Sequence, residues 1–100
     1  MTDDGNIPAT TESVRRVVVA NQFGLHARPA GQVAREAQRF SAAIRIVVDG
    51  EAVDAKSILS LLTLAAAKGS VLEIRAAGPD AEDAVACIEA LFLRRFGEGK

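Results

Sequence analysis

The sequence predicts a two-layer α/β sandwich, in which helices cover one face of a single sheet. Segments with strand and helix periodicity follow one another in the order β-α-β-β-α-β-α. Residues 71–76 (VLEIRA) alternate apolar and charged side chains, which is typical of a strand with one buried and one solvated face. A chain of 100 residues is long enough for one hydrophobic core. One domain is therefore expected over residues 14–100.

Composition and charge exclude several classes of protein. Hydrophobic residues make up 49% of the chain, which indicates a globular protein, and the only aromatic residues are four Phe. The net charge is −1 without a basic stripe, so nucleic-acid binding is not expected. Cys87 is the only cysteine and provides neither a disulfide nor a cysteine cluster for zinc. A reducing, cytoplasmic setting fits this usage.

Residues 1–13 are predicted to form a flexible tail. The segment MTDDGNIPATTES is polar and acidic without periodicity, which is the reverse of a signal peptide. The most apolar stretch, ILSLLTLAAAKG at 58–69, is shorter than the roughly 20 residues that a membrane-spanning helix needs. We therefore expect a soluble protein.

The first strand is expected at 15–20, where RRVVVA is rich in β-branched residues. A loop follows, and a helix is predicted from Ala27 to Arg39, with apolar residues at the i, i+3, i+4 and i+7 positions. Pro29 fits the first turn of that helix, where its missing N–H is no loss. The proline places His26 at, or just before, the helix N-terminus.

The middle of the chain is predicted to be a hairpin followed by a helix. Strands at 43–48 and 51–54 flank an Asp49-Gly50 turn. Ser57 is a suitable N-cap for a helix over 58–67, which is apolar around most of its circumference. Lys68-Gly69 is predicted to end this helix.

The last strand, at 71–76, is followed by a third helix that begins after Asp80 as its N-cap. Its first turn is acidic, and Arg94 and Arg95 are expected in its last turn. Both charges have the sign that the helix dipole favours.

His26, the only histidine, lies within GLHARPAG at 24–31. A lone histidine at a helix start is often a capping or surface residue. However, a helix N-terminus attracts anions, and Arg28 offers a guanidinium fork that matches phosphate oxygens. Gly24 and Gly31 are predicted to keep the approach to this site open.

Several chemistries compete for this histidine. One His and one Cys are too few for a metal site, and no carboxylate near in sequence is available to orient a general base. A neutral imidazole needs only an electrophile and stabilisation of the product charge to act as a nucleophile. The residues therefore indicate a phosphoryl relay, in which His26 is phosphorylated and the protein acts as a carrier rather than an enzyme.

GLHARPA, followed about thirty residues later by DAKSILSLLTLAAAKG, resembles the HPr family over residues 14–95. These proteins are histidine-containing phosphocarriers of the bacterial phosphoenolpyruvate-dependent phosphotransferase system. The resemblance implies an antiparallel sheet of order 1-4-2-3 under three helices. It also implies a cytoplasmic monomer without cofactor or metal. His26 would accept a phosphoryl group on Nδ1 from phosphorylated enzyme I and pass it to an enzyme IIA, while Arg28 stabilises the phosphorylated state.

The resemblance also assigns a docking surface and a regulatory site. Apolar side chains at the start of the second helix would bind both partners, with Arg28 and Lys56 at the rim; these side chains are Ile58, Leu59 and Leu62. Leu61 and Leu64 are expected in the core instead. Ser57 corresponds to a serine that HPr kinase/phosphorylase phosphorylates in some bacteria.

Some features leave alternatives open. Ala65 stands where many family members have glycine, and ALFLRRFGEGK is more like the nitrogen-branch variant, NPr. Whether the protein serves sugar uptake or a regulatory branch is therefore open. A regulatory binding module, with phosphorylation only as a switch, is the alternative function. A small ligand-binding domain is a third, although no residue pattern indicates a ligand.

Overall fold

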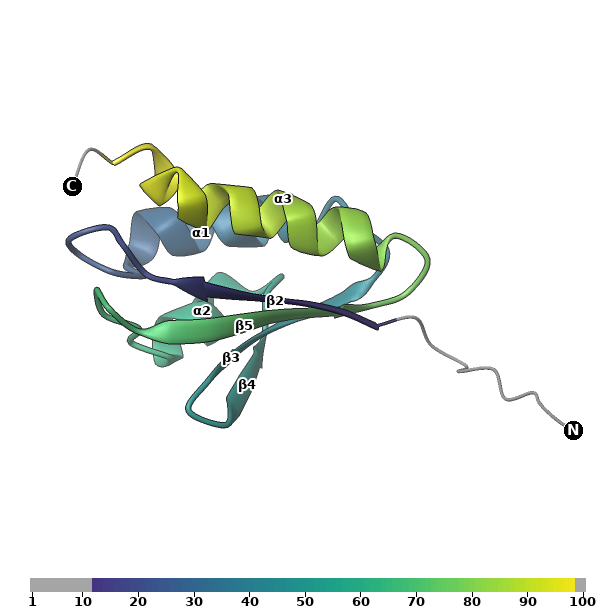
Figure 1. Ribbon diagram of the computed structural model, residues 1–100, viewed down its shortest axis with the longest axis horizontal. Coiled ribbons are helices and arrows are strands. Elements are labelled where there is room, and N and C mark those ends of the chain that lie inside the picture. The colour runs from purple at the N-terminus through teal and green to yellow at the C-terminus, as the bar shows by residue number, and fades with distance from the viewer. Residues whose placement is uncertain (1–11, 99–100) are drawn as a thin grey trace, which may run out of the picture.

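The computed structural model describes residues 12–98, which form one sheet with two long helices lying side by side over one of its faces (Figure 1). The elements are β2 (Glu12–Val18), α1 (Ala27–Ala37), β3 (Ala43–Val48), β4 (Glu51–Asp54), α2 (Ile58–Thr63), β5 (Val71–Ala77), α3 (Ala81–Leu93) and the 3-10 turn η1 (Arg95–Gly97). The predicted two-layer sandwich and its order of elements are confirmed.

The sheet is antiparallel throughout, in the order β2-β5-β3-β4. In chain order this is 1-4-2-3, as the resemblance implied. The register places Val17 opposite Leu72 and Ile46 opposite Ile74, so that apolar side chains of neighbouring strands share the covered face. This face is the floor of the hydrophobic core.

Helices α1 and α3 close the core from the other side. The predicted apolar face of α1 is buried, including Ala30, Val33, Ala34 and Ala37. The buried side chains of α1 are mostly small, whereas α3, which contacts β2, β5 and β3, supplies larger ones, among them Ile88 and Phe92. The short helix α2 packs against α1 and β4. Helix α1, whose N-terminus carries His26, is therefore packed against both α2 and α3.

The first two element boundaries differ from those predicted. Strand β2 spans Glu12–Val18 instead of 15–20, because its first residues pair with the end of β5, Glu12 opposite Ala77. Residues 12 and 13 therefore belong to the sheet and not to the predicted tail, whose other residues, 1–11, lie outside the described part of the chain. Helix α1 ends at Ala37, and the predicted Arg39 lies beyond it.

Helix α2 is shorter than predicted and ends at Thr63 instead of residue 67. Ala65 has φ +49°, a left-handed conformation that cannot continue a helix. The carbonyl of Ala66 then accepts a hydrogen bond from Leu25 N–H at 2.9 Å. The helix therefore stops before Ala65, the position where many family members have glycine, and not at Lys68-Gly69.

Both ends of α3 also differ in detail. Asp80 is the N-cap residue, but its carboxylate does not cap the helix; it accepts hydrogen bonds from the N–H groups of Ser41 and Ala42 at 2.9 and 2.8 Å. Arg94 and Arg95 lie after the last helical residue, since Arg95, Phe96 and Gly97 all have positive φ and cannot continue the α-helix. Phe96 is buried in an edge-to-face contact with Phe92. The residue that follows this turn, Glu98, lies against the start of α1.

Candidate functional site

His26 is the N-cap residue of α1, with an extended backbone at φ −82° and ψ −171°. Its carbonyl accepts the N–H of Ala30, while its ring makes no capping bond and its side chain is 37% exposed. Pro29 has no N–H, so the free amides of the first turn are those of Ala27 and Arg28. The first turn contains no acidic residue. An anion beside the ring would therefore meet partial positive charge without a competing carboxylate on the helix.

The loop before His26 is held by the segment after α2. Gly24 has φ +68°, and a Cβ atom there would lie 2.3 Å from the carbonyl oxygen of Ala66. Gly24 was predicted to keep the approach to His26 open. In the structure, glycine is required at this position because the two backbones lie too close together for a side chain. At Gly31 a Cβ atom would meet nothing within 4 Å. Any substituent there would enter open space in the groove beside α1.

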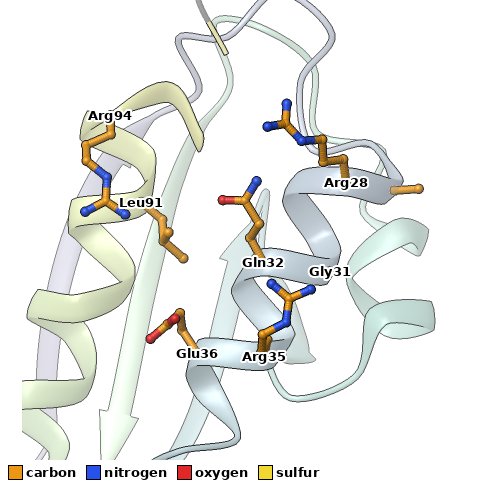
Figure 2. A pocket seen from close by; sticks show the side chains of 8 residues that line it. Arg28, Gly31, Gln32, Arg35, Glu36, Leu91 and Arg94 are labelled. Carbon is orange, nitrogen blue, oxygen red and sulfur yellow. The ribbon is translucent and has the colours of Figure 1, made fainter. Parts of the chain in front are cut away.

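Arg28 points outward from the first turn of α1, and its side chain is 60% exposed. It lies at one end of a groove between α1 and α3 (Figure 2). Arg35 from α1 and Arg94 beside the end of α3 also line the groove, with the amide of Gln32 between the two helices (Figure 2). The groove that leads away from His26 is thus rich in cationic side chains.

Glu98 is a site residue that sequence reasoning missed. Its Oε2 lies 2.8 Å from His26 Nε2 and 3.4 Å from the Arg28 guanidinium, and its Oε1 accepts from Asn21 Nδ2 at 2.9 Å. The hydrogen bond from Asn21 lowers the pKa of the Glu98 carboxyl below its ordinary value, and His26 and Arg28 add to the effect. No local pattern links two residues 72 positions apart.

Phe23 is a second residue that was missed. Its side chain is 72% exposed, and its ring meets the His26 ring edge to face with 6.1 Å between the centroids. An aromatic residue in a polar loop next to the histidine was the available signal in the sequence. It places apolar surface immediately beside the imidazole.

The predicted division of α2 into exposed and buried side chains is confirmed. Ile58, Leu59 and Leu62 are exposed, Leu59 to 77%, and we refer to these three residues as the α2 patch. Leu61 is fully buried, and Leu64 is partly buried against the core. Three exposed aliphatic side chains on one short helix form a surface suited to a protein partner.

Lys56 and Ser57 immediately precede α2 and the α2 patch. Ser57 is the N-cap of α2, as predicted, and its Oγ accepts the N–H of Ser60 at 3.2 Å. Lys56 donates from Nζ to the carbonyl of Phe40 at 2.7 Å, so its ammonium group is tied to the loop after α1.

Residues 12–98 contain neither a candidate metal site nor a candidate membrane-spanning helix. In this part of the chain, no group of three or more His, Cys, Asp or Glu side chains is arranged to hold a metal ion. None of its helices is long and apolar enough to cross a membrane.

Comparison with known proteins identifies the family. The model of the PTS HPr component phosphorylation site family matches residues 13–93. The chain belongs to the HPr family. Its relatives include the phosphocarrier protein HPr of Treponema pallidum, which is 44% identical over 85 residues, covering 85% of this chain and 97% of that protein. HPr proteins are phosphocarriers of the phosphotransferase system, so the class of function implied by the resemblance is confirmed.

Both named branches of the HPr family occur among the relatives. The phosphocarrier protein NPr of Escherichia coli K12 is 40% identical over 83 residues, covering 82% of this chain and 92% of that protein. Among solved structures, HPr-C-His from Thermoanaerobacter tengcongensis matches with a TM-score of 0.85 and 34% identity, covering 88% of this chain and 99% of that chain. The fold is therefore that of HPr.

Proposed function

We propose that this protein carries a phosphoryl group on His26 Nδ1, which it accepts from phosphorylated enzyme I and passes to an enzyme IIA. The observation that carries the proposal is the partly exposed imidazole at the N-terminus of α1, with Arg28 in the first turn. The protein would act in the cytoplasm as a monomeric relay without cofactor or metal. It would be a substrate of its partners and not an independent enzyme.

Charge stabilisation supports this chemistry. A phosphoryl group on His26 would lie next to the free N–H groups of the first turn of α1, where the helix dipole favours negative charge. Arg28 is exposed, and among residues 12–98 its ion pair is a 3.4 Å contact to Glu98, so its guanidinium can turn toward the phosphoryl oxygens. The open surface suits transfer between proteins, since the partner's own phosphorylated group must reach the ring.

The α2 patch would provide the docking surface for both partners. Helix α2 contacts α1, and the three exposed aliphatic residues of the patch would be desolvated when a partner covers both helices. Arg28 would lie at the rim and supply charge complementarity to an acidic partner. Lys56 would contribute at the rim only by giving up its bond to Phe40.

Ser57 would be a regulatory site in addition to its capping role. A phosphate on this side chain is compatible with a helix N-terminus, so α2 should persist after modification by an HPr kinase/phosphorylase. The added negative charge would lie beside the α2 patch and weaken the docking of acidic partners.

The test is incubation with enzyme I, Mg²⁺ and phosphoenolpyruvate, followed by mass spectrometry of the intact protein. We expect an acid-labile adduct of one phosphoryl group in the wild type and none in His26→Ala. Absence of the adduct in the wild type, or an unchanged adduct in the variant, would contradict the proposal. Control of a partner that survives His26→Ala in a binding assay would favour the regulatory binding module instead.

A further inference from the structure

We propose that Glu98 is a positioning residue, which holds neutral His26 in the tautomer with its proton on Nε2 and so presents the lone pair of Nδ1 to the phosphoryl group. The inference rests on the proposed function of His26 and adds a second residue to it. It explains, from the contacts of this chain, why one ring nitrogen and not the other would be the nucleophile.

The hydrogen bond between the two side chains defines the tautomer. Glu98 Oε2 lies 2.8 Å from His26 Nε2, and the carboxyl has a pKa lowered first by the bond from Asn21. An ionised carboxylate has no proton and can only accept. Nε2 must therefore carry the hydrogen of this bond, and in a neutral imidazole the other nitrogen then has the free lone pair.

Asn21 holds the carboxylate in this orientation. Its side chain is fully buried, and its Nδ2 donates both to the carbonyl of Gly24 at 2.7 Å and to Glu98 Oε1 at 2.9 Å. The reverse amide orientation would place an oxygen against two acceptors, so this one is required. Glu98 itself has a side chain that is only 13% exposed. The carboxylate is thus fixed from the protein side, and His26 occupies its remaining oxygen.

The backbone that leads to Glu98 adopts an unfavourable conformation at two residues. Arg95 and Phe96 have φ +52° and +57°, conformations that non-glycine residues adopt at a cost. Phe96 is held by its buried ring against Phe92 and by a bond from Gln32 Nε2 to its carbonyl at 3.1 Å. The strained turn is thus anchored to the core through Phe96, and the residue after it, Glu98, contacts His26. Such strain is typical of functional sites.

With this tautomer, the phosphoryl group can be transferred to His26 without loss of a proton from the ring. The lone pair of Nδ1 forms the bond to phosphorus, while the bond from phosphorus to the donor group breaks and its electron pair stays on the donor. No proton leaves His26, because Nε2 keeps its hydrogen. The ring becomes an imidazolium that carries the phosphoryl group on Nδ1, and the Glu98 carboxylate stabilises the positive charge on the ring.

Two substitutions of Glu98 separate positioning from packing. Glu98→Ala removes the acceptor, and the neutral ring returns to a mixture of its two tautomers. Glu98→Gln keeps the shape but has one acceptor oxygen for two donors. The side chain of Asn21 is fully buried and out of reach of solvent, whereas His26 is partly exposed. The Gln oxygen would therefore serve Asn21, and its NH₂ group would face Nε2 and favour the wrong tautomer.

The first readout is the ¹⁵N chemical shifts of both His26 ring nitrogens at a pH where the ring is neutral. We expect one tautomer, protonated on Nε2, in the wild type and in the control Glu51→Gln, which alters an exposed glutamate in the β3–β4 hairpin. In Glu98→Ala the two signals should move toward each other. In Glu98→Gln they should move further. Unchanged shifts in both Glu98 variants would overturn the inference.

The second readout is the rate of phosphoryl acceptance from phosphorylated enzyme I. We expect a loss of several-fold in Glu98→Ala and of about 10- to 100-fold in Glu98→Gln, the range typical of residues that orient a reactive ligand. A purely structural role predicts the opposite order, because Gln fills the same space, and that order would overturn the inference. Failure of the wild type to be phosphorylated would instead refute the proposed function, and the ¹⁵N shifts would still test the tautomer.

Discussion

Gly24 lies so close to Ala66 that a Cβ atom on the glycine would be 2.3 Å from the alanine carbonyl oxygen. The same carbonyl accepts the N–H of Leu25, which immediately precedes His26. Ala66 in turn follows the left-handed Ala65 that ends α2. The histidine loop and the segment carrying the α2 patch are thereby joined through backbone atoms, so the two parts of the site are positioned together.

Gly24→Ala should lower the free energy of unfolding by about 3 kcal/mol, since it combines a steric clash with a positive φ that disfavours side chains. Gly31→Ala is the matched control, because a Cβ atom there meets nothing and alanine favours a helix interior by about 0.5–1 kcal/mol. Urea denaturation measures both values. Equal stability of the two variants would show that the contact with Ala66 is relaxed in solution.

Arg28→Ala should slow phosphoryl acceptance by His26 about 100-fold, because it removes the charge-assisted donor that faces the developing negative charge. The side chain is largely exposed, so the free energy of unfolding should hardly change. Rapid-quench measurement of the phosphorylated protein gives the rate. Arg16→Ala, an exposed arginine paired with Glu73 on the sheet, is the control and should react as fast as the wild type.

Leu59→Ala should affect docking and Leu61→Ala should affect stability, although the two residues lie in the same turn of α2. Leu59 is 77% exposed, so its loss should leave stability unchanged within about 0.5 kcal/mol but raise the KM for phosphorylated enzyme I. Leu61 is fully buried, and its truncation should cost about 2–5 kcal/mol. Thermal unfolding and transfer kinetics distinguish them. A Leu59 variant with unchanged KM would remove this residue from the docking surface.

Ser57→Ala should lower the free energy of unfolding by about 1 kcal/mol, because Ser60 N–H loses its capping acceptor. Ser57→Asp keeps an acceptor at the N-cap and should be as stable as the wild type. Its negative charge beside the α2 patch should nevertheless weaken transfer from enzyme I. Comparing stability with transfer rate in both variants separates the cap from regulation; normal transfer in Ser57→Asp would argue against the regulatory role.

Asp80 makes stability depend on pH. The N–H of Ser41, followed by that of Ala42, holds the pKa of this carboxyl below its ordinary value of 3.8. The native state thus favours the ionised form, and the stabilisation is present above the ordinary pKa and lost as the pH falls through the lowered one. Asp80→Asn should therefore be less stable than the wild type at pH 7, and the gap should narrow below about pH 4. Urea midpoints across this range measure the gap. A gap of constant size would contradict the assignment.

Local patterns in the sequence predicted much of the fold and part of the site. The periodicity of residues 30–37 identified the buried face of α1, and Pro29 located the start of that helix beside His26. The excess of apolar residues in α2 separated exposed Leu59 from buried Leu61. Each of these features depends on residues within about two turns of one another, and such short-range constraints are present in the sequence itself.

The tertiary structure decided the remaining features. After α2, the carbonyl of Ala66 accepts a hydrogen bond from Leu25 N–H and does not continue the helix. The carboxylate of Asp80 binds the loop before β3 and does not cap α3. Glu98 contacts His26 from the end of a turn that is anchored by the buried ring of Phe96. By itself, therefore, the sequence determined the elements, their faces and the place of the histidine. Packing of segments distant in the chain determined which carboxylate faces that histidine, because no spacing between residues encodes a contact formed across the core.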